Sequence, residues 1–131
     1  MGTHVLVPVD TSSGAWKAFK HVLSQYPDEQ ITVLHVIDPG ANMRSEKQHI
    51  EQQITERVHK ICENADIETD RITIETESGK PSHTIVRYAT DNDIDQIVMG
   101  SRGLSDMDKL LLGSVAETVV RRSPVPVNVI R

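Results

Sequence analysis

The feature that most constrains the fold is a regular alternation between short apolar runs and segments in which apolar residues recur at helical spacing. The apolar runs, rich in Val and Ile, predict strands at 4–9, 31–37, 71–76, 96–100 and 125–130. Helical spacing predicts helices from about 15 to 25, from 45 to 65, from 81 to 89 and from 114 to 122. Parallel strands joined by helical crossovers are covered on both faces. This order therefore predicts an α/β fold, a single open five-stranded parallel sheet with helices on both faces.

Composition limits the classes of function. The 131 residues fit one domain, 1–131, and aromatic residues make up only 3%, so Val, Ile, Leu, Ala and Met must build the core. The formal net charge of −5 argues against broad binding to nucleic acid or to anionic membranes, which needs a surplus of Lys and Arg. The lone Cys62 excludes an intrachain disulfide and suits a reducing compartment. With neither a signal peptide nor an apolar membrane-spanning stretch in the sequence, we expect a cytoplasmic protein without membrane insertion.

Polar and glycine residues follow the predicted strands. Asp10 follows the first strand, Asp38 the second, 77–79 the third and 100–103 the fourth. An open parallel sheet binds ligands beyond the carboxyl ends of its strands, where the strand order reverses. The site is therefore expected among these residues.

The sharpest local pattern is a spaced set of glycines near the end of the chain. Gly100 and Gly103 flank Arg102 where the fourth strand ends, and Gly113-Ser114 opens the last helix nine residues later. Glycines let a backbone approach a phosphate closely, and the unpaired N–H groups of a helix N-terminus attract anions. The pattern favours a phosphate site, and the alternative is an ordinary turn followed by an ordinary helix N-cap.

Other candidate sites are weaker. The six histidines show no His-x-x-x-His spacing, so no protein-built metal site is expected. Asp10 is a single carboxylate, which more often caps a helix or holds a ligand hydroxyl than acts as a catalytic base. Cys62 lies among apolar helix positions, which predicts an inert core thiol, and His35 is expected to be a strand residue that is satisfied locally. Ser45 to Gln48 fits a capping box for the long helix.

The glycine spacing, Gly-x2-Gly-x9-Gly-Ser, resembles the nucleotide-binding pattern of the ATP-binding branch of the universal stress protein family. The resemblance covers essentially the whole chain and is carried by 5–10, 34–38, 79–81, 95–103 and 123–127. It implies a Rossmann-like sheet with strand order 3-2-1-4-5. It also implies ATP as the ligand, with AMP or ADP as alternatives and magnesium only if it arrives with ATP.

The same resemblance implies a set of binding residues. The first strand and Asp10 would face the nucleoside, the second strand would meet the adenine edge through its backbone, and the glycine segment would wrap the ribose and phosphates. The implied nucleotide-binding residues are Pro8, Val9, Asp10, Thr11, Val36, Met99, Gly100, Arg102, Gly103, Gly113, Ser114 and Val115. The family often has Gly-Ser after the aspartate, where this chain has Thr11-Ser12.

The resemblance further implies a homodimer through the last strand, where Asn128 replaces the family's usual apolar residue. Three functions remain open at this point. The first is an ATP-binding stress-response regulator, with an unknown protein partner, that is not an enzyme. The second is a slow nucleotide hydrolase that uses Asp10 and Arg102. The third is an interaction module whose glycine motif is vestigial, as the acidic Asp106 and Asp108 beside the glycines would allow.

Overall fold

The structure is a computed structural model that describes residues 3–10, 13–37, 44–101 and 112–131. The sequence also predicts a short helical piece around 106–112, of which residues 106–111 lie outside these ranges, as do Asp38, Asp106 and Asp108. None of the helices in the described ranges is long and apolar enough to cross a membrane.

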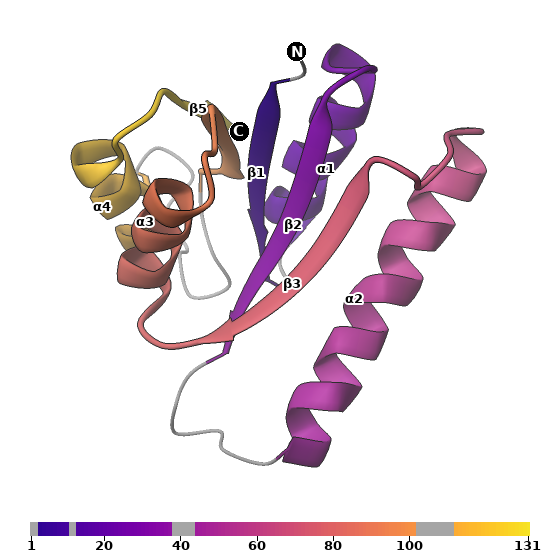
Figure 1. The fold of residues 1–131 in the computed structure, drawn as a ribbon, viewed down its shortest axis with the longest axis horizontal. Coiled ribbons are helices and arrows are strands. Elements are labelled where there is room, and N and C mark those ends of the chain that lie inside the picture. The colour runs from indigo at the N-terminus through magenta and orange to yellow at the C-terminus, as the bar shows by residue number, and fades with distance from the viewer. Residues whose placement is uncertain (1–2, 11–12, 38–43, 102–111) are drawn as a thin grey trace.

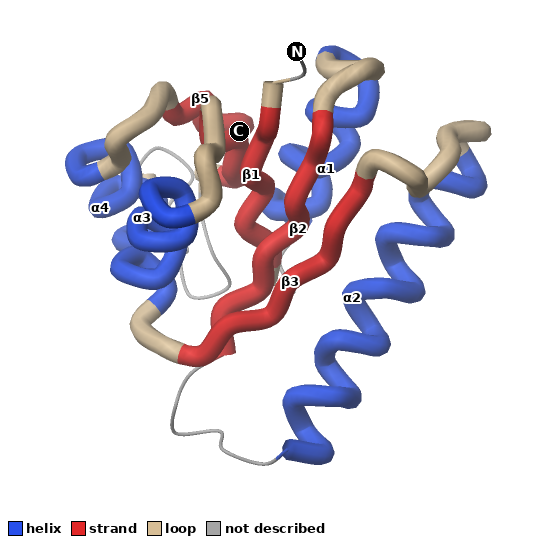
Figure 2. The backbone as a smooth tube through the Cα atoms, in the orientation of Figure 1, coloured by secondary structure: helices blue, strands red, loops and turns tan. Residues whose placement is uncertain are grey.

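Strands and helices alternate along the chain, and the strands form one parallel sheet in the order β3-β2-β1-β4-β5 (Figures 1 and 2). This confirms the predicted α/β fold. The elements are β1 (His4–Val9), α1 (Ser13–Gln25), β2 (Gln30–Ile37), α2 (Arg44–Asn64), β3 (Ile72–Ser78), α3 (Pro81–Asp91), β4 (Gln96–Gly100), α4 (Ser114–Arg122) and β5 (Val127–Ile130).

Apolar side chains alternate along the strands, so the sheet has a core on each face. On one face, Val5, Val7 and Val98 pack with the apolar sides of α1 and α2. On the other face, Leu6 and Ile97 pack with the apolar sides of α3 and α4. Figure 1 shows this division, with α3 and α4 together on one side of the sheet. Burial on both faces explains why the central strands are continuous apolar runs.

Most element ends lie within one or two residues of the sequence prediction, and three of the differences are informative. β3 runs to Ser78, two residues past its predicted end, because it pairs with β2 as far as Ile37. β5 begins at Val127 rather than at residue 125, which fits the lack of an N–H group on Pro124 and Pro126. α2 begins at Arg44, one residue before the Ser45 that the predicted capping box places ahead of the helix.

Candidate functional site

A cavity of about 130 Å³ lies at the carboxyl ends of the central strands, where the strand order reverses. It is bounded by the ends of β1, β2 and β4 and by the first turns of α1, α3 and α4. Residues implied by the resemblance make up much of its lining, namely Pro8, Val9, Asp10, Val36, Met99, Gly100 and Val115. The position matches the rule that open parallel sheets bind ligands at the switch point.

The cavity walls are mostly apolar. Sequence reasoning missed part of the lining, which comprises Ala15, Leu34, Pro81, Ile85 and Ala116. Apolar periodicity marked several of these residues as core, but it could not show that α3 and α4 bring them to the end of β1. Apolar walls around one carboxylate suit a flat, weakly polar ring that carries hydroxyl groups at its edge.

Two side chains hold the backbone at the end of β1. Nε1 of Trp16 donates a hydrogen bond to the carbonyl oxygen of Asp10 at 2.9 Å. Nδ1 of His35 donates to the carbonyl oxygen of Val9, also at 2.9 Å, which confirms that His35 is satisfied locally. Both bonds fix the backbone of Val9 and Asp10 at the end of β1, where both residues line the cavity.

Gly100 lies where β4 meets the first turn of α1. A Cβ atom at Gly100 would stand 2.8 Å from the carbonyl carbon of Gly14 and 3.0 Å from the amide nitrogen of Ala15. Both neighbours are backbone atoms, which cannot move aside by rotating a side chain. The packing of α1 on β4 therefore requires a glycine here, independently of any ligand.

The start of α4 is tied to the end of β4. The amide of Gly113 donates to the carbonyl oxygen of Ser101 at 2.6 Å, and the carbonyl of Gly113 accepts the amide of Glu117 at 2.9 Å. The Gly113 N–H therefore has a backbone partner in this structure, and its role in phosphate binding stays a prediction. Within the described residues, the free N–H groups of this helix end belong to Ser114, Val115 and Ala116.

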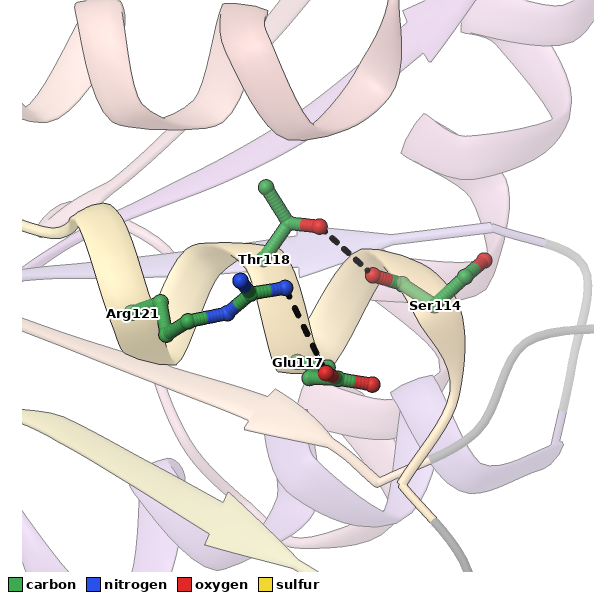
Figure 3. A network of polar contacts seen from close by, with 4 residues as sticks. All are labelled: Ser114, Glu117, Thr118 and Arg121. Carbon is green, nitrogen blue, oxygen red and sulfur yellow. Dashed lines mark hydrogen bonds and ion pairs between the residues drawn. The ribbon is translucent and has the colours of Figure 1, made fainter.

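Gly113, and not Ser114, is the N-cap residue of α4, with no side-chain capping bond. The carbonyl of Ser114 accepts the hydroxyl of Thr118 at 3.0 Å. Figure 3 shows the Ser114 hydroxyl pointing away from Thr118, at the open end of the helix. Farther along the same helix, Arg121 pairs with Glu117 at 3.3 Å. Ser114 is thus exposed beside free N–H groups at the positive end of the helix dipole.

Thr11, Arg102 and Gly103 lie outside the described residues. The described residues contain no group of three His, Cys, Asp or Glu side chains able to hold a metal ion. The shifted pKa values lie away from the cavity. Burial raises the pKa of the Cys62 thiol, and burial, with a smaller contribution from Glu75, raises the pKa of Tyr88. Cys62 is fully buried, in agreement with the core thiol expected from the sequence.

The model of the universal stress protein family matches residues 1–131. The chain belongs to this family. A universal stress protein from Methanocaldococcus jannaschii is 30% identical over 97% of this chain and 93% of its own length. The solved structure of universal stress protein UspA from Lactobacillus plantarum has a TM-score of 0.83 at 30% identity, covering 98% of this chain and 97% of that one.

More distant members of the fold have been solved with nucleotides. A universal stress protein from Archaeoglobus fulgidus in complex with dAMP has a TM-score of 0.74 at 20% identity, covering 100% of this chain and 98% of that one. Other structures of this fold hold AMP and cAMP. At these identities the likeness establishes the shared fold, while the bound nucleotides belong to those proteins.

Proposed function

We propose that this universal stress protein binds ATP in the switch-point cavity and acts as a stress-response regulator without strong catalysis. The observation that carries the proposal is the meeting of two features at one place. An apolar cavity with Asp10 in its lining opens beside the N–H groups of Ser114, Val115 and Ala116. The cavity suits an adenine ring, Asp10 suits the ribose hydroxyls, and the helix end suits phosphates.

The structural relatives support the adenine part of the proposal. Proteins of this fold have been solved with AMP, dAMP and cAMP, which share the adenine base and a phosphate group. The choice of ATP rests on the glycine spacing at Gly100, Gly103 and Gly113, which resembles the ATP-binding branch of the family. ADP or AMP would use the same base and ribose contacts with fewer phosphates at α4, and magnesium would enter only with ATP.

The side chains that line the switch-point cavity favour a regulator over an enzyme. Among the described residues that line the cavity, Asp10 is the one carboxylate, and the other lining residues carry no titratable side chain. A slow hydrolase would require Asp10 to act with Arg102. Incubation of ATP with the wild type and with Asp10→Ala separates the two functions, because only a hydrolase loses turnover in the variant.

Equilibrium calorimetry with ATP, ADP and AMP, each with and without magnesium, tests the binding proposal. We expect ATP to bind, and we expect mass spectrometry to detect adenine nucleotide released from the purified protein. Ser114→Val removes the hydroxyl and places a branched side chain at the exposed helix end. It should therefore weaken the binding of ATP more than the binding of adenosine, which has no phosphates. Arg131→Ala, at an exposed position in the chain's last residue, is the control. An absence of measurable affinity for all three nucleotides would overturn the proposal.

We also propose a cytoplasmic homodimer that forms through β5. In the described sheet β5 pairs with β4 alone, and Asn128 on this strand is exposed. The carbonyls of Pro126 and Ile130 accept hydrogen bonds from Ile97 in β4 and from Ser101 just after it. By the alternation of a parallel ladder, Val127 and Val129 therefore direct their polar backbone groups outward. Val129→Pro removes one outward N–H and should dissociate the dimer in sedimentation experiments, whereas Asn128→Ala should dissociate it less.

A further inference from the structure

A groove separate from the cavity runs between α1 and α2, on the opposite face of the sheet from α3. It consists of two adjoining hollows, of about 440 Å³ and about 320 Å³. Both hollows are lined by Lys20 from α1 and by Ile61 and Asn64 from α2, so they form one continuous surface. None of their lining residues belongs to the switch-point cavity.

One end of the groove is basic. Lys20, Arg57 and Lys60 line it with exposed side chains, and Glu56 is the single carboxylate in the lining. Glu56 accepts a hydrogen bond from Nε2 of Gln52 at 3.3 Å. In the described parts of the chain, no carboxylate lies within ion-pair distance of the three cations. A local excess of positive charge is therefore left open on a chain whose net charge is −5.

One of these cations is held in place. The guanidinium carbon of Arg57 lies 4.9 Å from the centroid of the Trp16 ring. Trp16 is itself buried and fixed by its hydrogen bond to the Asp10 carbonyl. The stacking orders the planar guanidinium, whose parallel N–H groups match a carboxylate. An ordered arginine loses less conformational freedom on binding an anion than a free side chain does.

The other end of the groove is apolar. Leu23, Ile61, Ala65 and Ile67 line it, and Ile61 and Ile67 are only partly buried at the edge of the core. Lys20 lies at the junction between the two ends. A ligand that fills the groove must therefore present carboxylates at one end and an apolar side chain at the other.

We propose that this groove docks an acidic segment of a partner protein that carries an apolar anchor residue. Carboxylates of the segment pair with Lys20, Arg57 and Lys60, and the anchor packs between Leu23 and Ile61. The apolar end favours a polypeptide over nucleic acid, whose sugar-phosphate backbone offers no such anchor, and the acidic net charge also disfavours a long polyanion. The concave shape disfavours a flat membrane surface. The proposal goes beyond nucleotide binding and does not depend on it.

A synthetic peptide of twelve residues with eight glutamates and two adjacent leucines is the probe, labelled for fluorescence anisotropy and titrated with the full chain. The test variant is Lys20→Glu/Lys60→Glu. The matched control is Lys47→Glu/Arg87→Glu, which makes the same change in net charge at exposed positions outside the groove. Thermal unfolding checks that both variants fold. Trp16 is the only tryptophan and lies under Arg57, so its emission provides a second readout.

We expect the wild type to bind the peptide with a salt-sensitive affinity and to change its Trp16 emission. The groove variant should bind at least about tenfold more weakly, and the control variant less than about threefold more weakly. Replacing the two leucines by serines should also weaken binding. No binding by the wild type at low salt, or equal losses in both variants, would overturn the proposal. So would tighter binding of a single-stranded oligonucleotide, or a self-association of the chain that only the groove variant loses.

Discussion

Replacing Gly100 by alanine separates the packing role of this glycine from its proposed role beside a nucleotide. The added methyl group would lie 2.8 Å from the carbonyl carbon of Gly14, 2.9 Å from its oxygen and 3.0 Å from the nitrogen of Ala15. Carbon–carbon contacts are most favourable at about 3.5 to 4.0 Å. The first turn of α1 must therefore retreat from β4 by about 0.7 Å to accept the methyl group.

The retreat of α1 would loosen the core on that face of the sheet. Trp16, Phe19 and Val22 lie on this helix and are almost completely buried. Overpacking of this kind costs about 1 to 3 kcal/mol, because the interior is close-packed and the strain spreads. At about 4 °C for each kcal/mol, the melting temperature should fall by roughly 4 to 12 °C.

Urea unfolding followed by Trp16 emission, in protein freed of nucleotide, measures this cost. Ser114→Ala is the control, because its side chain is exposed and makes no capping bond, and its free energy of unfolding should change by less than about 0.5 kcal/mol. A Gly100→Ala protein as stable as the wild type would refute the reasoning, since the close approach of α1 would then impose no requirement for glycine.

Three further changes test the site and the core. Gly113→Val should fold, because φ −65° and ψ 159° suit a branched residue, but its side chain should block the phosphates and reduce the affinity for ATP. A calorimetric Kd for ATP equal to that of the wild type would contradict the proposed site. Asp10→Ala should weaken adenosine binding by roughly 10- to 150-fold, the value of a charged hydrogen bond, and an unchanged Kd would remove Asp10 from the site. Burial raises the pKa of Cys62, so the folded state keeps the thiol protonated to a higher pH than the unfolded state does. The free energy of unfolding should therefore fall as pH rises above about 8.5, the ordinary pKa of a thiol. In urea titrations, Cys62→Ala should lose less stability at alkaline pH than the wild type does. An equal loss in both proteins would show that Cys62 is not its source.

The fold could be predicted from the sequence because its strands are apolar on both faces. Runs such as 31–37 have no polar alternation, which points to a parallel sheet covered by helices. The ends of elements were harder to place, because they depend on partners far along the chain. β3 reaches Ser78 only because β2 offers a partner as far as Ile37, and no local signal in the sequence records that pairing.

Residues of the candidate site that lie at the end of a strand could be predicted from the sequence. Residues that reach the cavity from separate helices could not. Asp10 and Gly100 follow from the switch-point rule, since each lies at the carboxyl end of a central strand. Ile85 and Ala116 line the same cavity from helices, and their spacing marks them only as core. The bond from Gly113 to Ser101 is a tertiary contact, which the spacing of the glycines could not indicate.

Two glycines of the spaced set have contacts within the fold itself. At Gly100 a side chain is excluded by the backbone of α1, and at Gly113 the amide is already bonded to Ser101. Gly100 therefore serves the fold before it serves a ligand, whereas any residue except proline could supply the amide at position 113, so the packing accounts for the first glycine of the spacing. The groups that the fold leaves available to a nucleotide are the N–H groups of Ser114, Val115 and Ala116. Because those groups belong to the helix end that the bond from Gly113 to Ser101 holds beside β4, the packing that builds the sheet also positions the proposed anion site.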